Sequence, residues 1–576
     1  MPDGMKRTPA ALAAATAAMA VLLCAARPAA AADPAPPAKA ETLTIGVNDF
    51  PGTWNPNTEA QGIKAYIAWM AYRPLTYYDA DWNLACGLCT ELPSREKGTA
   101  WPEKLPDGRT GVALKYTLNP KAVWGDGTPV TTRDVLFTWR VGRHDDTGFA
   151  NQYLFSDDIR DIEAVDDKTF IVRRSRYVCS YAELNDFLLL PSHLEREAFE
   201  KDPSGYKVHS RYESDTTNPG LWMGPYRVAK VEPGASVILE RNPRWYGKRP
   251  HFDRIVVRSL EQSAALEQAM LAGDVDYVAG EYGFSVHQAS QLEKHHGHKF
   301  DVVWKQGLSY RHLDVNHDNP ALRDVRVRRA LLMAINRDLI NDRLYYGRNV
   351  MAHGFVNPLD SVYEADVPQY PFNPAAAGKL LDEAGWILGQ DGVRRNAAGK
   401  PLSVELVAVS GDRTIDLELQ IIRDAWRRVG VSTETRTAIA RVMFGDLLTE
   451  RKFTGLALFS WVATPLAVPR TTLHSDAVPT ADNGWAGQNF LGYRDPKMDA
   501  LIERTESQCE PKGSRQAWGE LQRYYAEQLP ALPIFFQSDA FFFPRWLKGV
   551  TPTGHQFDST IAVEDWHRAE PEPSGR

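Results

Sequence analysis

The sequence lacks the motifs that the common enzyme classes carry. None of the patterns HExxH, GxSxG, GxGxxG or the P-loop occurs in its 576 residues. The densest histidine cluster is His295, His296 and His298, and ligands so close in sequence rarely close a tetrahedral metal site. We therefore predict no catalytic residue, no bound metal and no cofactor, which leaves binding as the remaining class of function.

Positive charge is not in excess, and long apolar runs are confined to the N-terminus. The chain has 66 Lys and Arg against 73 Asp and Glu, which gives a formal net charge of -7. A mildly acidic protein has no electrostatic reason to bind nucleic acid. No segment after residue 40 is apolar enough to cross a bilayer.

The N-terminus has the pattern of a secretory signal. Lys6 and Arg7 precede the Ala-rich run Ala10–Ala26, and small residues end at Ala32. We predict a signal peptide over 1–32, cleavage into the periplasm, and a Pro-rich tether over 33–40. Lipid anchoring at Cys24 is the alternative, and it ranks second because Leu23 is larger than the residue that a lipobox needs.

Five cysteines occur in the chain, and four remain after Cys24 is removed with the signal. Export permits disulfides, and Cys86, Cys89, Cys179 and Cys509 allow three pairings. Cys86 and Cys89 form a CxxC pair, which is typical of redox or metal sites as well. Because a second CxxC and a nearby histidine are missing, we favour a local disulfide between Cys86 and Cys89.

Helix signals alternate with strand signals, which indicates α/β lobes. Thr131 and Asp134 have the spacing of a capping box. Asn373, Asp412 and Ser514 are the N-terminal residues expected for three further helices, each followed by apolar residues at helical spacing. About 540 mature residues exceed what one hydrophobic core supports, so we expect more than one lobe.

Ordered sequence blocks from about residue 41 to 550 then point to a family. They include the turn at 126–129 (DGTP), 224–226 (GPY), 239–243 (LERNP), 324–330 (DVRVRRA) and 380–386 (LLDEAGW). In wording and order these blocks resemble the peptide/nickel family of extracytoplasmic solute-binding proteins, the receptors of ABC importers.

The resemblance implies a two-lobed α/β periplasmic-binding-protein fold, also called a Venus flytrap, with an extra subdomain inserted in the first lobe. The hinge strands would lie near Trp304–Leu313 and Ile534–Phe541. Mapped onto this sequence, the parts are 41–80, 222–308 and 538–566 for lobe I, 81–221 for the inserted subdomain, and 309–537 for lobe II.

The resemblance also implies a function and partners. The protein would be a monomer that traps a peptide or peptide-like small solute between its lobes and delivers it to ABC permease subunits in the inner membrane. Two alternatives stay open: an extracytoplasmic sensor or chaperone that uses the same closure, and a receptor for a non-peptide solute such as a sugar or a nickel chelate. An exported hydrolase has no motif to support it.

One departure from the family concerns the ligand. Family members that hold free peptides carry an Asp after a Trp, and this Asp pairs with the peptide α-ammonium group. In the matching stretch Phe459–Pro465, Thr464 stands where that Asp would be. A buried ammonium group without a charge partner is costly. We therefore expect weak binding of peptides held by a free amino end, and N-blocked or peptide-like solutes become more credible.

Candidate ligand-binding residues follow from their positions at strand ends, where ligands bind in open α/β sheets. Trp461 and Thr464 follow the strand predicted at 456–459. The other candidates of this group follow the first strand or the strand predicted at 275–279, and they are Asn48, Phe50, Trp54, Tyr282 and Phe284.

The remaining candidates are polar groups near the hinge or in a loop. Arg311 and His312 lie next to the proposed hinge, and Arg413 begins a predicted helix. An arginine can bind a carboxylate of the ligand through two nitrogens. The alternatives are a salt bridge between lobes for Arg311 and a solvent-exposed position for Arg413. The long loop after Trp461 adds His474, Trp485 and Asn489.

Overall fold

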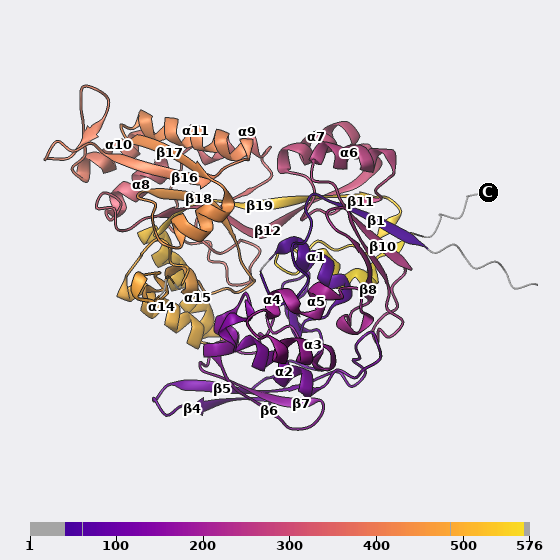
Figure 1. Ribbon diagram of the computed structural model, residues 1–576. Coiled ribbons are helices and arrows are strands. Elements are labelled where there is room, and N and C mark those ends of the chain that lie inside the picture. Colours follow the sequence, from indigo (N-terminus) through magenta and orange to yellow (C-terminus); the bar gives the residue numbers. More distant parts are fainter. Residues whose placement is uncertain (1–40, 60, 484, 486, 570–576) are drawn as a thin grey trace, which may run out of the picture. The chain divides into compact units, whose positions relative to one another are not determined.

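The computed structural model describes residues 41–569 except 60, 484 and 486, and it shows a mixed α/β fold (Figure 1). The signal peptide, the tether and Cys24 lie outside the described residues. Within the described part, no helix is both long and apolar enough to cross a membrane.

A mixed sheet of 11 strands organises the described residues. Its order is β17-β16-β18-β12-β19-β11-β1-β10-β9-β8, and β13 pairs with β19 off this path. The bounds in that order are Ser432–Ala438, Ser403–Val409, Leu456–Val462, Phe300–Val315, Ala531–Pro544, Tyr277–Val278, Thr42–Val47, Arg254–Ser259, Ser236–Arg241 and Tyr226–Glu232, with β13 at Val350–Met351.

The two long middle strands, β12 and β19, are antiparallel and connect the two ends of this sheet (Figure 1). Their pairing is regular from Phe300 to Gln306 and resumes at Tyr310, with an irregularity between. At that point Asn357 donates a hydrogen bond to the Gly307 carbonyl oxygen at 2.7 Å. The ladder is therefore interrupted halfway along both strands, where the sequence predicts a hinge.

Separate hydrophobic cores lie at the two ends of these strands. One core gathers buried side chains from 43–279 and 541–566, including Trp124, Trp222 and Trp566. Another gathers side chains from 313–535, including Trp426. The described residues therefore build two large cores beside several smaller clusters, and β12 and β19 are the long strands that run between the two ends of the sheet.

A second sheet, of order β4-β5-β7-β6, belongs to the first core. Helix α2 (Thr132–Gly142) follows β5, and the capping box is confirmed: Thr131 accepts from the helix backbone while Asp134 accepts from the backbone of Thr131. The strands are Ala100–Lys104, Thr110–Thr117, Thr169–Arg174 and Ile159–Ala164.

Two of the three other predicted helix starts are confirmed and one is wrong. Asn373 caps α10 (Pro374–Glu383) and Asp412 caps α11 (Arg413–Arg428), which packs on β16 and β17. Helix α15 (Pro511–Gln528) begins three residues before Ser514, at Pro511. Proline is favoured in the first turn of a helix, because the backbone N–H that it lacks would have no acceptor within the helix there. The other long helices are α1 (Gly62–Ala71), α3 (Ser192–Lys201), α6 (Ser263–Ala272), α7 (Val286–His296), α8 (Val325–Ala334), α9 (Arg337–Leu344) and α14 (Pro496–Ser507).

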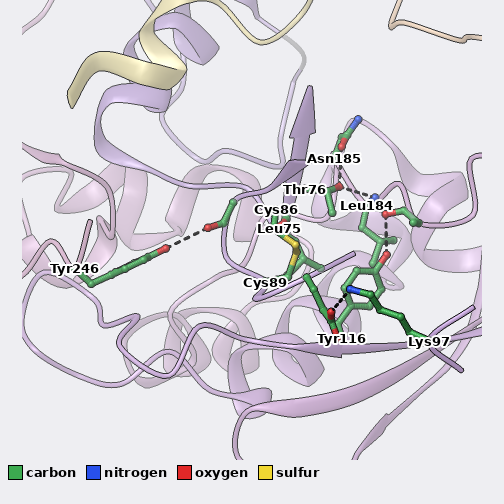
Figure 2. Close-up of a disulfide and its surroundings, with 12 residues drawn as sticks. Leu75, Thr76, Cys86, Cys89, Lys97, Tyr116, Leu184, Asn185 and Tyr246 are labelled. Atoms are coloured by element: carbon green, nitrogen blue, oxygen red, sulfur yellow. Dashed lines mark hydrogen bonds and ion pairs between the residues drawn. A yellow bond between two sulfur atoms is a disulfide. The ribbon is translucent and has the colours of Figure 1, made fainter. Parts of the chain in front are cut away.

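Two disulfides join the four cysteines of the described chain. Cys86 and Cys89 form the local bridge that the sequence favoured, beside Thr76, Leu184 and Asn185 (Figure 2). The second bridge joins Cys179 to Cys509 across 330 residues. The first bridge closes a short turn after β3 (Leu84–Cys86), whereas the second connects distant parts of the chain.

Candidate functional site

A cleft of about 560 Å³ is lined by side chains from distant parts of the chain, from Glu183 to Gln556. Its size is within the range of small-molecule sites. Strand β12, the end of β18, the loop after β18 and helix α15 form one side, and a segment near residue 185 faces them. The lining residues used below are Glu183, Asp186, Tyr310, His312, Asp314, Phe355, Asp360, Trp461, Thr464, Trp518 and Tyr525.

Alternate residues of β12 form the floor of the cleft. Tyr310, His312 and Asp314 are two residues apart, so their side chains point to the same face of the strand. The Tyr310 and His312 rings are stacked with centroids 4.7 Å apart. The hydroxyl groups of Tyr310 and Tyr525 are 3.1 Å apart, which joins the floor to α15.

His312 and Asp314 form a buried polar pair in this floor. Nδ1 of His312 lies 3.0 Å from the Tyr310 carbonyl oxygen, and Nε2 lies 3.1 Å from Oδ1 of Asp314. Oδ2 of Asp314 is buried and has no hydrogen-bond partner among the described residues.

Trp461, the first candidate from the sequence, lines the cleft and is held by aromatic neighbours. Its ring stacks on Phe490 with centroids 5.9 Å apart and meets Phe459 edge to face. Thr464 also lines the cleft, three residues further along the loop. The structure therefore brings these two candidates together with His312.

An acidic wall faces this aromatic side. Glu183 and Asp186 lie in a segment without regular secondary structure, and Thr76 fixes that segment: its hydroxyl accepts from the Leu184 backbone at 2.9 Å and donates to Asn185 at 2.7 Å (Figure 2). Burial, followed by the nearby charge of Asp186, raises the pKa of Glu183 to about 7.

Asp360 brings a further carboxylate close to Thr464. Its Oδ2 accepts a hydrogen bond from the backbone N–H of Leu466 at 2.9 Å, and the residue is only 9% exposed. Burial raises the pKa of Asp360. The stretch that lacks the expected Asp at position 464 therefore has a carboxylate beside it, supplied by another part of the chain.

Arg311, predicted either as an anchor for a ligand carboxylate or as a partner in a salt bridge between lobes, pairs with a buried glutamate. Nε and Nη2 of Arg311 lie 2.9 and 2.7 Å from Oε2 of Glu418 on α11, and Glu418 is fully buried. Arg311 does line a second cavity, of about 250 Å³, but Glu418 neutralises its charge. Arg413 is exposed at the start of α11 and lines neither cavity.

The candidates at the first strand end connect elements and do not line the large cleft. Asn48 donates to the Gly283 carbonyl oxygen at 2.8 Å. Tyr282 meets Tyr66 edge to face, while Phe284 lines the second cavity. Phe50 and Trp54 contact each other with ring centroids 6.3 Å apart, and the Trp54 backbone donates to Glu213.

The three candidates from the long loop also lie outside the lining of the cleft. Asn489 is fully buried and donates to the carbonyl oxygens of His474 and Tyr493, which folds the loop on itself. His474 is buried beside Asp476, and Trp485 is half-buried in a turn. These roles are structural in this arrangement.

Reasoning from the sequence missed most of the polar lining. The strand period of two offered one signal. If His312 of β12 lines the cleft, Tyr310 and Asp314 lie on the same face of the strand and are expected to line it too. Glu183, Asp186 and Asp360 lie in irregular segments and carry no such signal. Among the described residues, no group of three or more His, Cys, Asp or Glu side chains has a geometry that holds a metal ion.

Comparison with solved structures defines the class of fold. The oligopeptide-binding protein of Thermus thermophilus, solved with a pentapeptide, superposes with a TM-score of 0.75 at 22% identity, over 92% of this chain and 96% of that chain. NikZ of Campylobacter jejuni, solved with Ni(L-His), gives 0.72 at 20% identity, over 92% and 99%. The predicted two-lobed periplasmic-binding-protein fold is thus confirmed.

The family follows from the sequence match. Residues 100–476, more than half of the chain, match the model described as bacterial extracellular solute-binding proteins, family 5 Middle. The chain therefore belongs to the family 5 bacterial extracellular solute-binding proteins, and the family predicted from the sequence is confirmed.

Curated relatives are distant. The oligopeptide-binding protein AppA of Bacillus subtilis (strain 168) is 20% identical over 528 residues, which cover 89% of both chains. A protein of Brucella suis biovar 1 (strain 1330) is 29% identical over 357 residues. That match covers 59% of this chain and spans only 59% of the relative's length.

Proposed function

We propose that the protein is the solute-binding receptor of an ABC importer and that it traps a peptide or peptide-like solute between two lobes. The observation that carries the proposal is the cleft of about 560 Å³. The segment around Glu183 lines one side, and β12, the loop after β18 and helix α15 line the other, with the irregularity of the β12–β19 pairing at Leu308 of the lining. Ligand contacts from both sides would stabilise a closed state over an open one. The lobe boundaries given by the family resemblance are part of this proposal.

The location and partners follow from the same proposal. The N-terminal signal pattern favours export to the periplasm with cleavage after Ala32, and the closed, loaded protein would dock on permease subunits in the inner membrane. Peptides are supported by the lining: Trp461, Tyr310, Phe355 and Trp518 supply aromatic walls, with polar groups between them.

A nickel or other metal chelate is the second candidate, because a structural neighbour was solved with Ni(L-His). A chelate brings its own donors, so the receptor need not supply three metal ligands. Four carboxylates line the cleft, however, and they oppose an anionic chelate. The electrostatics therefore favour a peptide over an anionic metal complex.

Native mass spectrometry of the mature protein purified from the periplasm tests this function. We expect a bound species whose mass and fragmentation correspond to a peptide or a peptide-like compound. A thermal shift with a mixed peptide library supplies the second readout, and we expect a higher Tm. If the bound species is a sugar or a metal chelate, and the library leaves Tm unchanged, the peptide receptor proposal is wrong.

A further inference from the structure

We infer that the cleft selects basic peptides, whose ammonium or guanidinium side chains are held by a set of carboxylates from both sides of the cleft. This inference deepens the proposed function and rests on it. The set, called here the acidic lining, consists of Glu183, Asp186, Asp314 and Asp360. None of the described residues that line the cleft is a lysine or an arginine.

The charge balance of the cleft is the first argument. Among the described lining residues, His312 is the only one whose side chain can carry a positive charge, and its Nε2 already faces Asp314. Even with a charged imidazole, carboxylates exceed cations in the cleft. An ionised, partly buried carboxylate without a nearby cation is unfavourable. A ligand that brings a cation relieves this cost and should therefore bind more tightly than a neutral or acidic ligand.

Asp314 supplies an independent observation. The residue is 2% exposed and lines the cleft, yet Oδ2 has no hydrogen-bond partner among the described residues. Buried polar atoms are nearly always paired, so an unpaired carboxylate oxygen at a cavity indicates a donor that arrives with the ligand. The aromatic rings of Tyr310 and Trp461 line the same cavity, and such rings also attract cations.

The acidic lining comes from both sides of the cleft. Glu183 and Asp186 lie beside Leu184 and Phe187, which belong to the first core, whereas Asp314 lies next to Leu313 of the second core. On the first side, the Tyr78 hydroxyl lies 3.4 Å from Oε2 of Glu183. A cation placed between the two sides attracts both, so it favours the closed state that the proposed function requires.

Hydrogen bonds from other parts of the chain hold the backbone on the first side of the lining. Arg174 donates to the carbonyl oxygens of Tyr181 and Glu183 at 3.0 Å each, and Thr76 holds Leu184. The Cys86–Cys89 bridge closes the turn beside Thr76 (Figure 2). Fixed carboxylates bind a cation without the cost of ordering them, which increases discrimination between ligands.

Three tetrapeptides with an acetylated amino end that differ only at the third position test the inference: acetyl-Ala-Ala-Lys-Ala, acetyl-Ala-Ala-norleucine-Ala and acetyl-Ala-Ala-Glu-Ala. Isothermal titration of the mature protein at pH 8 should give a Kd for the Lys peptide about thirtyfold below that of the norleucine peptide, which corresponds to about 2 kcal/mol. The Glu peptide should bind more weakly than either. Added salt should reduce the preference for Lys.

Two other results are possible in this titration, and each contradicts a different proposal. Equal affinity for all three peptides, within threefold, overturns the charge selection but leaves the peptide receptor standing. If none of the three binds, the peptide receptor itself is in error for this length, and the mass spectrum of the native ligand identifies the true class.

Variants locate the selection in the acidic lining. Glu183→Gln, Asp360→Asn and Asp314→Asn should each reduce the ratio of Lys to norleucine affinity by about threefold. The norleucine peptide should still bind, which shows that each variant is folded. Asp157→Asn removes an exposed carboxylate from the same inserted region and should leave the ratio unchanged. A ratio that stays at the wild-type value in all three lining variants overturns the inference.

Discussion

Glu183 is the residue whose burial has the clearest consequence for stability. Its pKa is raised from 4.5 to about 7 by burial first and by Asp186 second. Between these two values the unfolded chain loses the proton while the folded chain keeps it, so the free energy of unfolding falls as pH rises and levels off above pH 7. Glutamine does not ionise, so the Glu183→Gln variant does not lose this stability as the pH rises.

We therefore expect Glu183→Gln to gain about 3 kcal/mol of stability relative to wild type when the pH is raised from 4 to 8. Urea unfolding followed by circular dichroism at the two pH values measures the difference. The exposed Asp157→Asn variant serves as the control. A difference between wild type and Glu183→Gln that does not change with pH would show that this carboxylate ionises freely in the folded protein.

Arg311 and Glu418 form a buried ion pair, so we expect removal of one partner to destabilise the protein more than removal of both. Glu418→Gln leaves the guanidinium group without its counter-charge and should lower the free energy of unfolding by about 3 kcal/mol. Replacing both residues, Arg311→Met with Glu418→Gln, removes the unpaired charge and should recover part of the loss. Urea unfolding of both variants provides the measurement, and a double variant less stable than Glu418→Gln alone would contradict this account.

The contrast between Arg311 and His312 shows why single site residues were hard to predict. Neighbours on a strand point to opposite faces, so only one of them could line the cleft. The sequence did not reveal which, because β12 is buried on both faces from Tyr310 to Val315 and shows no alternation there. Glu183, Asp186 and Asp360 depend on contacts between segments far apart in the chain, which no local pattern encodes.

Helices that begin with a capping residue could be predicted from the sequence, and α2 shows how such a cap contributes to stability. Thr131 accepts from the first turn of the helix, and its own backbone N–H is held by Asp134 at 2.9 Å. Thr131→Val removes the side-chain acceptor and should reduce the free energy of unfolding by about 1 kcal/mol. Thr437→Val, on an exposed position of β17, is the matched control and should change stability little.

Thermal or urea unfolding of the two Thr→Val variants measures this difference. Equal stability of Thr131→Val and wild type would mean that water replaces the cap at no cost. Asn373 and Asp412 begin α10 and α11 in the same way, which is why their starts were predicted correctly. At α15, Glu510 caps without a side-chain hydrogen bond, so the sequence held no polar signal at the true start.

At the scale of the whole molecule, the two disulfides have different consequences. Cys86 and Cys89 close a turn within one core, whereas Cys179, shortly before Glu183 in the chain, is joined to Cys509, shortly before α15. A backbone hydrogen bond from Cys179 to the Glu506 carbonyl oxygen, 2.7 Å long, and an ion pair between Arg176 and Glu506 lie beside the long-range bridge. The bridge therefore limits how far these two segments can separate when the cleft opens.

We expect the double variant Cys179→Ser, Cys509→Ser to open further than wild type when it holds no ligand, because the tether is gone. Small-angle X-ray scattering should show a larger radius of gyration, and bound peptide should dissociate faster. The loop closed by this bridge is long, so its loss should cost about 4 kcal/mol of stability, against about 2 kcal/mol for Cys86→Ser, Cys89→Ser. That second pair is the control, since it removes a bridge without releasing the cleft. Identical radii for wild type and the first variant would show that this bridge does not limit opening.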